Sequence, residues 1–298
     1  MSQTANPAAE QAARENKQKH RRQFIKTLFS RKIAIVAMVI LVVLILAALL
    51  ANVIAPYNPN AISISERTQG PSAAHLLGTD EFGRDVLSRI IYGSRVSLIV
   101  GVLAVAIACA IGTALGMIAG FFGGIVDDVI SRLAEAIRVI PQVVLAIALC
   151  TVFGGGVVNV AIILGISNVT VYIRMMRSQV MSIKERDFIM AGKLQGNSSL
   201  RLMVRHILPN SISPIIVTMT QQIGGTILSE AGLSFLGLGI SVPTASWGTL
   251  VAGGREYLLT NPVYSLAPGI CIALLVICLN TLGDGVRDAL DPRLRGEV

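Results

Sequence analysis

The amino-acid sequence predicts an all-α, polytopic membrane protein with six transmembrane helices in one bundle. The 298-residue chain is 53% hydrophobic and only 14% charged, whereas soluble domains carry about 25% charged residues. Several uncharged stretches approach or exceed the roughly 20 residues that a helix needs to cross a bilayer. The net charge of +8 does not indicate a nucleic-acid partner, because the excess cations lie beside apolar stretches, where they set membrane orientation.

Residues 1–32 form a basic tail ahead of the first predicted span. The tail holds eight lysines and arginines against two glutamates, and a cationic flank of this kind stays in the cytoplasm. Residues 33–55 follow, with no charge from Ile33 to Ile54. This stretch is too long for a signal-peptide core and lacks a clean cleavage pattern after it. We therefore expect a retained signal-anchor helix.

Residues 56–95 are polar, with balanced charge, and are predicted to lie on the periplasmic or extracellular side. Asp80, Arg84 and Asp85 can pair there, although a structural turn fits them at least as well. Residues 96–122 form the second predicted span. Glycines recur there at four-residue spacing, which favours close helix packing along one face. They are Gly112, Gly116, Gly120 and Gly124, the last of which can already belong to a turn.

The next two spans are predicted over 128–153 and 157–173. Only 35 uncharged residues separate Arg138 from Arg174, too few for two spans of about 20 residues each. We therefore predict that the third helix begins early, at residue 128, and is kinked near Pro141. Charges at its start stand three or four positions apart and can pair on a helix, with a solvated juxtamembrane turn as the alternative. The candidate pairs are Asp128/Arg132, Arg132/Glu135 and Glu135/Arg138.

Residues 174–207 are predicted to be a cytoplasmic loop with a helix–turn–helix form. Apolar residues around Phe188 and Leu194 are followed by Gly196, a typical helix stop. The Asn-Ser-Ser sequence after it supplies N-cap side chains. A second apolar stripe follows, made of Leu200, Met203, Val204, Ile207 and Leu208. By composition alone, an amphipathic hairpin lying on lipid fits equally well.

The last third of the chain completes the count of six. Residues 208–229 form the fifth span, 230–263 an outer segment, 264–283 the sixth span, and 284–298 a cytoplasmic tail. Within the outer segment, 231–254 is rich in glycine and is expected to be irregular or re-entrant. All six lysines lie in the N-terminal tail or the 174–207 loop. Six spans place both, and the C-terminal tail, in the cytoplasm; a seventh at 231–254 would put that tail outside.

Catalytic and metal-binding signatures are missing from the sequence. It has no GxxxxGK[ST] phosphate loop, so we do not expect this chain to hydrolyse ATP or to bind a cofactor. No GxSxG or HExxH motif occurs, and the three histidines lie in three different regions. The four cysteines lie in apolar stretches without metal-ligand spacing and are expected to be small packing residues. They are Cys109, Cys150, Cys271 and Cys278.

Three further side chains carry open interpretations. Glu230 and Asp284 lie at predicted span ends, and we favour helix-end or interface roles over a proton relay. Trp247 suits either an anchor at the outer membrane interface or a contact with a docked protein.

Residues 184–210 resemble the cytoplasmic loop of bacterial ATP-binding-cassette (ABC) importer permeases. That pattern reads Glu-Ala-Ala, three residues, Gly, nine residues, Ile, one residue, Leu-Pro. Aligned on Gly196, this chain supplies Ala191, Leu208 and Pro209. It departs with Met190 in place of Glu, Gly192 in place of Ala, and His206 in place of Ile.

Three other blocks strengthen the resemblance and extend it over roughly residues 30–296. "HLLGTDEFGRDVLSRIIYGSRVSL" (75–98), "EAGLSFLGLGISVPTASWG" (230–248) and "GDGVRDALDPRLRG" (283–296) look like signatures of the dipeptide, oligopeptide and nickel permease group. The chain is most similar to the second, C-type permease of such systems. The resemblance implies the type I importer fold and a multi-pass location in the bacterial inner (plasma) membrane.

The resemblance also implies partners and a role for the loop. A second permease, two ABC ATPase subunits or domains that bind ATP and Mg²⁺, and an extracytoplasmic substrate-binding protein are expected. The loop would form a coupling helix in a cleft of an ATPase. Ala191, Gly192 and Gly196 would allow close approach, and Arg186, Lys193 and Arg201 would make rim contacts. The acidic contact made by the family's Glu, which Met190 replaces here, would be missing, or Glu185 or Asp187 would supply it.

The substrate implied is a di- or oligopeptide, moved by alternating access at the interface between permeases. Importers of nickel, metal chelates or glutathione share these signatures and remain alternatives. An ion-coupled secondary transporter is the competing class, but internal repeats, which are typical of that class, are not evident. A membrane enzyme is a weaker alternative.

Overall fold

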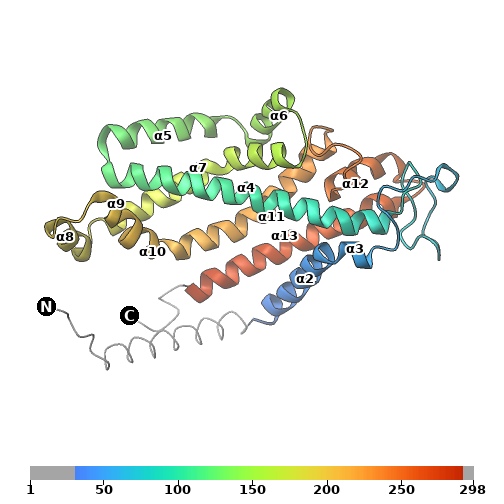
Figure 1. Cartoon of the computed structure of the whole chain (residues 1–298), viewed down its shortest axis with the longest axis horizontal. Helices are drawn as coiled ribbons and strands as arrows, with labels where there is room; N and C mark the ends of the chain where they lie inside the picture. Colours follow the sequence, from blue (N-terminus) through green and yellow to red (C-terminus); the bar gives the residue numbers. More distant parts are fainter. Residues whose placement is uncertain (1–30, 291–298) are drawn as a thin grey trace.

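A bundle of long helices makes up the computed structural model, which describes residues 31–290. Most of the predicted N-terminal tail (1–30) and residues 291–298 lie outside the described part. Every regular element in this part is a helix, which confirms the all-α class (Figure 1). The helices are α2 (Lys32–Leu49), α3 (Ala51–Ile54), α4 (Val86–Phe122), α5 (Gly124–Val139), α6 (Gln142–Phe153), α7 (Val157–Ile183), α8 (Asp187–Leu194), α9 (Ser199–Leu202), α10 (Leu208–Asn210), α11 (Ile212–Phe235), α12 (Trp247–Gly254) and α13 (Pro262–Leu290).

The number of membrane spans is four or five by length and composition. Within residues 31–290, α2, α4, α7 and α13 are each long and apolar enough to cross a membrane. The pair α5 and α6 makes a fifth if the two are one broken span. Helix α11 corresponds to the predicted fifth span, and its 24 residues are long enough. It does not meet the same apolarity criterion, because Gln221, Gln222 and several threonines interrupt it, so the predicted count of six is not confirmed.

Several helices run beyond their predicted bounds. Helix α4 begins at Val86 rather than at 96, because the Asp85 side chain caps it by accepting from the backbone N–H of Ser88 at 2.7 Å. Helix α7 continues to Ile183, past the predicted end at 173 and past Arg174 and Arg177. Apolarity reports the part of a helix that lies in hydrocarbon, whereas the backbone hydrogen bonds continue into the polar regions on either side.

The predicted third helix, 128–153 with a kink, is wrong in form. Two helices, α5 and α6, meet at 88°. Pro141 has no backbone N–H and disfavours a helical conformation at Ile140, whose ψ is 124°. None of the three ion pairs predicted on α5 forms; instead Asp127 binds Arg177 on α7, with Nε–Oδ1 at 2.5 Å.

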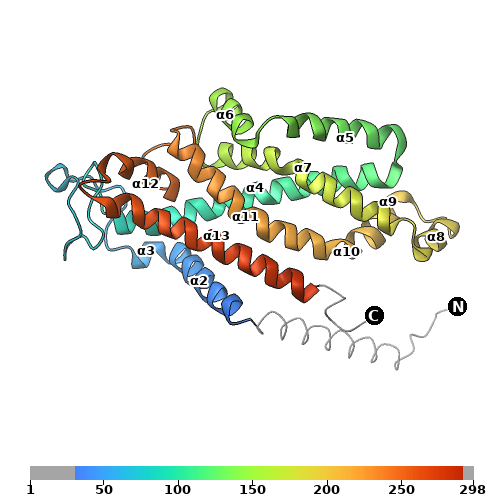
Figure 2. The same cartoon turned by 180° about the vertical axis from the view of Figure 1, so that it is seen from behind.

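The predicted glycine face joins α4 to α7. A Cβ atom on Gly116 would stand 2.3 Å from the carbonyl oxygen of Ile173, and one on Gly112 would stand 2.5 Å from the Tyr172 Cβ. A Cβ atom on Gly120 would likewise meet Val180, whereas Gly124, the first residue of α5, faces open space. The two backbones therefore touch, and the helices lie side by side over much of their length in both views (Figures 1 and 2).

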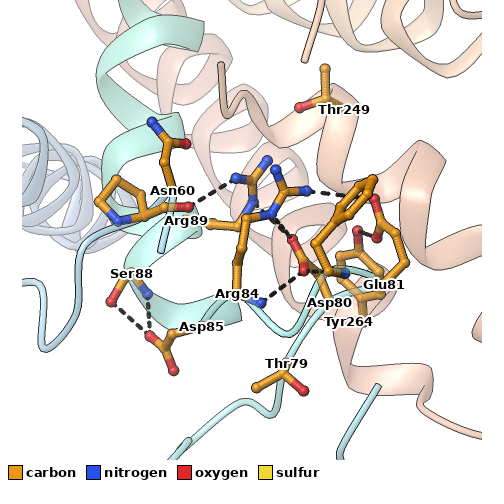
Figure 3. Close-up of polar contacts among 12 residues, drawn as sticks. Asn60, Thr79, Asp80, Glu81, Arg84, Asp85, Ser88, Arg89, Thr249 and Tyr264 are labelled. Carbon is orange, nitrogen blue, oxygen red and sulfur yellow. Dashed lines mark hydrogen bonds and ion pairs between the residues drawn. The ribbon is translucent and has the colours of Figure 1, made fainter. Parts of the chain in front are cut away.

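A buried network of charges closes the end of the bundle where α4 begins (Figure 3). Asp80 is fully buried, accepts from Nε of Arg84 at 2.6 Å, and lies 3.2 Å from Nε of Arg89. Arg89 also donates to the carbonyl of Pro59 at 2.9 Å, which ties the 55–85 segment to α4. Glu81 accepts from the hydroxyl of Tyr264 on α13. Of the two predicted alternatives, Asp80 and Arg84 do pair and are buried, and the turn between them leaves Phe82 exposed.

We expect Gly116→Ala to loosen the α4–α7 contact. The new methyl group overlaps a backbone oxygen that cannot rotate away, and overpacking of this kind costs about 1–3 kcal/mol. Thermal unfolding of the purified protein in detergent should show a lower midpoint. Gly269→Ala on α13 is the matched control, since nothing lies within 4 Å of its Cβ position. Equal midpoints for the two variants would contradict the contact.

We expect Asp80→Asn to destabilise the fold strongly. It leaves the buried Arg89 with no carboxylate within 4 Å, and breaking a buried pair costs about 3–5 kcal/mol. The same unfolding measurement checks this. Glu256→Gln, which removes one partner of the exposed Arg255–Glu256 pair, should leave the midpoint unchanged. A similar small effect from both variants would show that the network does not hold the outer end.

Candidate functional site

The 184–210 segment projects from the end of the bundle where α4 and α7 stop (Figure 1). It holds α8, a turn at residues 195–198, and then α9, a π-helical turn over Met203–Ile207, and α10. This confirms the expected helix–turn–helix form. Only residues 184–186 separate α8 from α7.

Gly196 ends α8 in the way that the sequence predicts. Its φ of 76° lies in the left-handed region, which suits glycine. The backbone N–H of Asn197 donates to the carbonyl of Gly192 at 3.1 Å, and that of Gly196 donates to Lys193 at 2.9 Å. These two bonds define a Schellman motif. Ser198 then caps α9 by accepting from the backbone N–H of Arg201.

Buried side chains anchor the segment against the bundle. Ile189, Met203 and Ile207 join one apolar cluster with Met176 and Val180 of α7. Gly192 is also buried, and a Cβ there would meet the Leu202 side chain at 2.9 Å. Its small size thus serves the packing of α8 on α9 and does not offer a free face to a partner.

The predicted apolar stripe of the second helix is partly wrong. Met203 and Ile207 are buried as expected, but Leu200 is 66% exposed and Val204 is also exposed, while Leu202 takes the buried position. The π turn adds a residue to the helical repeat, so the spacing of an α-helix misplaces these side chains.

The exposed side of the segment is apolar at its tip and charged around it. Leu194 is 91% exposed, and Phe188 and Met190 are also exposed. The other predicted residues on this side, all exposed, are Glu185, Arg186, Asp187, Ala191, Lys193, Arg201 and Pro209, with Leu208 half-buried. Glu185, Arg186 and Asp187 form no ion pair within the described residues. Apolar side chains gathered at the tip of a projecting segment indicate a protein contact.

Two contacts that the sequence did not predict fasten this segment to α4. The Lys184 ammonium donates to the carbonyl of Gly120 at 2.9 Å. The Lys193 ammonium lies 5.6 Å from the centre of the Phe121 ring, a cation–π distance. Both join residues more than 60 positions apart, and no local pattern signals them.

Glu230 is an internal hub rather than a helix-end charge. It is fully buried, and its carboxyl accepts from the hydroxyls of Ser234 at 2.8 Å, Ser246 at 3.0 Å and Ser97 at 3.4 Å. These bonds join α11 to α4 and to the start of α12. Asp284, in contrast, is exposed and accepts from Gln221 at 3.3 Å.

Trp247 occupies neither of its two predicted environments. It is 1% exposed and donates from Nε1 to the carbonyl of Ile90 at 3.0 Å. The chain at 236–246 is irregular, as predicted for this outer region, but Ala231–Phe235 still belongs to α11 and α12 begins at Trp247. The indole locks α12 onto α4.

Metal-binding geometry does not occur in residues 31–290, where no three His, Cys, Asp or Glu side chains group together. The four cysteines are free; Cys150 and Cys278 are buried, and the other two are half-buried.

Comparisons with known proteins agree with this picture. Residues 112–296 match the family of the binding-protein-dependent transport system inner membrane component. Residues 21–71 match the N-terminal transmembrane domain of oligopeptide transport permease C.

Similar curated proteins cover nearly the whole chain. A dipeptide transport system permease protein of Alkalihalophilus pseudofirmus is 43% identical over 274 residues, 92% of this chain and 90% of that protein. A di/tripeptide transport system permease protein of Pseudomonas aeruginosa is 37% identical over 280 residues, 92% of each chain. A glutathione transport system permease protein of Shigella flexneri is 39% identical over 275 residues, 92% and 91% of the two chains.

The predicted family is therefore confirmed, and the role it carries is that of a transport subunit and not of an enzyme. The chain is a multi-pass inner-membrane permease that belongs to the binding-protein-dependent ABC importers of the peptide group.

Proposed function

We propose that this chain translocates di- or oligopeptides across the inner membrane by alternating access. The dipeptide and di/tripeptide permeases that match over 92% of the chain support this substrate class. Glutathione is the second candidate, favoured by the 39% identical glutathione permease; it is itself a small peptide, so the two share backbone amides and carboxylates.

Other subunits supply the energy for transport and complete the transport path. A second permease completes the pathway, two ATPase subunits or domains bind ATP and Mg²⁺, and a substrate-binding protein delivers the peptide from the outer side. Both termini and the 184–210 segment face the cytoplasm, because the lysines gather in the tail and in this segment. No cofactor binds to the chain itself.

The 184–210 segment couples ATP hydrolysis to transport. The exposed tip at Phe188, Met190 and Leu194 is the observation that carries this proposal, because an apolar tip suits a protein cleft. The charged residues around it then make rim contacts with the ATPase. When two ATPases close on ATP, the two permeases' tips move together. The apolar anchor and the Lys184–Gly120 bond pass that movement to α7 and α4.

Solubilisation in mild detergent should recover this chain in a fixed ratio with a second permease and ATPase subunits. The measurement is the identification of every polypeptide that co-purifies from the native membrane. Recovery of the chain alone, together with uptake that needs no ATP, would support an ion-coupled transporter instead.

Gly196→Asp should lower ATP-driven uptake at least tenfold without loss of membrane insertion. The new side chain meets open space within this subunit, but it places a charge where the ATPase cleft closes on the turn. Uptake and ATP hydrolysis are measured in proteoliposomes that contain the complete importer.

Gly237→Asp is the matched control for backbone strain. Gly237 ends α11 with φ of 77°, the same Schellman bonds and an open Cβ position, but it lies at the opposite end of the bundle. It should keep uptake within twofold of the wild type. Equal loss in both variants would assign the effect to strain, and normal coupling in Gly196→Asp would remove the coupling role.

A further inference from the structure

One side of helix α5 is too charged to face lipid. Five of its 16 residues are charged, and all but Asp127 are exposed in this chain. Its first turn is bonded to Arg177 of α7. The next helix, α6, begins at Gln142, which donates to Asn168 at 3.2 Å. Asn168 lies 15 residues before the end of α7, about 22 Å along the helix axis. The far end of α5 thus lies beside the middle of α7, where charges face water or protein.

A polar cavity of about 250 Å³ lies between α5 and α7. Its polar lining consists of Ser131, Glu135, Arg138, Thr170, Arg174 and Arg177. Arg177 is held by Asp127. Within residues 31–290, neither Arg138 nor Arg174 has a carboxylate within 4 Å, and Glu135 has no cation that close. Two guanidiniums and one carboxylate therefore border the cavity without ionic partners.

Uncharged polar groups continue from the top of this cavity. Asn168 receives the bond from Gln142 and donates to the Thr226 hydroxyl of α11 at 3.3 Å. Gln142 and Ser229 line a second cavity of about 270 Å³ between α6, α7 and α11. The break between α5 and α6 separates the two cavities. Uncharged polar groups thus continue past the α5–α6 break, although apolar side chains make up most of the lining of the second cavity.

We propose that the α5–α7 cavity is a substrate site on the inner half of the transport path, in which Arg138 and Arg174 bind the terminal carboxylate of a peptide. This rests on the proposed function. Glu135 faces the terminal ammonium, so the site carries both charges of a zwitterionic peptide. Unoccupied guanidiniums bind carboxylates through paired hydrogen bonds. A partly open site, exposed to water, holds the peptide weakly enough for release to the cytoplasm.

The uptake test uses the complete importer in phosphatidylcholine vesicles, which hold no anionic headgroup. The double variant Arg138→Gln/Arg174→Gln should lower uptake of a labelled dipeptide at least tenfold, while ATP hydrolysis stimulated by the binding protein stays within twofold. Arg132→Gln, an exposed charge on α5 outside the cavity, is the control and should keep both rates. Wild-type uptake by the double variant, in these vesicles, overturns the site. If the double variant then loses uptake only in vesicles that contain anionic lipid, the ligand of the two arginines is a lipid phosphate.

A second test does not depend on which substrate the importer carries. In inside-out vesicles, a membrane-impermeant anionic methanethiosulfonate should modify Ser131→Cys in the cavity. It should not modify Leu133→Cys on the exposed apolar side of α5. The unsubstituted protein gives the background from its own cysteines. Adding the two arginine substitutions should slow the reaction at residue 131 at least threefold.

The two tests separate the possible failures. If the wild-type importer moves no peptide but residue 131 reacts as described, the substrate class is wrong and the anion-binding cavity stands. If residue 131 does not react, or if residue 133 reacts equally, the cavity is not an aqueous path and the inference fails.

Discussion

Between Gly112 and Gly120, the backbones of α4 and α7 meet with almost no side-chain volume between them. This contact makes α4, the longest of the described helices, and α7 one stiff unit. One end of it carries the buried Asp80 network, and the other end carries the bonds from Lys184 and Arg177. The 184–210 segment is continuous with this unit. Packed backbone, rather than flexible side chains, therefore connects this segment to the network at the opposite end.

The polar interior is built from the less regular elements. Helix α11 carries glutamines and threonines, and the α5–α6 break leaves polar side chains at mid-bundle. Both are poor candidates for lipid contact, which is why they suit a pathway. Glu230 lies on the outer side of this region and holds three hydroxyls from two neighbouring segments and from α11 itself.

Local patterns predicted what local physics decides. The four-residue glycine spacing marked the α4–α7 contact, and Gly196 marked the end of α8, because each depends on one helix repeat. Pro141 predicts a kink, whereas α5 and α6 meet at a sharp corner, because a proline shows that a helix breaks but not by what angle. Asp127–Arg177 and Lys184–Gly120 join distant positions that no periodicity relates. The sequence does not reveal the buried position of Trp247, because its hydrogen-bond partner, the carbonyl of Ile90, lies 157 positions away.

Helix α4 has 37 residues and is about 55 Å long, nearly twice the roughly 30 Å of a hydrocarbon core. Its outer turns, with Arg89 and Arg95, therefore stand clear of the lipid and act as a stalk. The 55–85 segment, which packs on these turns, is held in place by its own ion pairs, and these do not depend on the thickness of the membrane. The chain can thus settle a little deeper or shallower in bilayers of different composition, while the surface presented to soluble proteins stays the same.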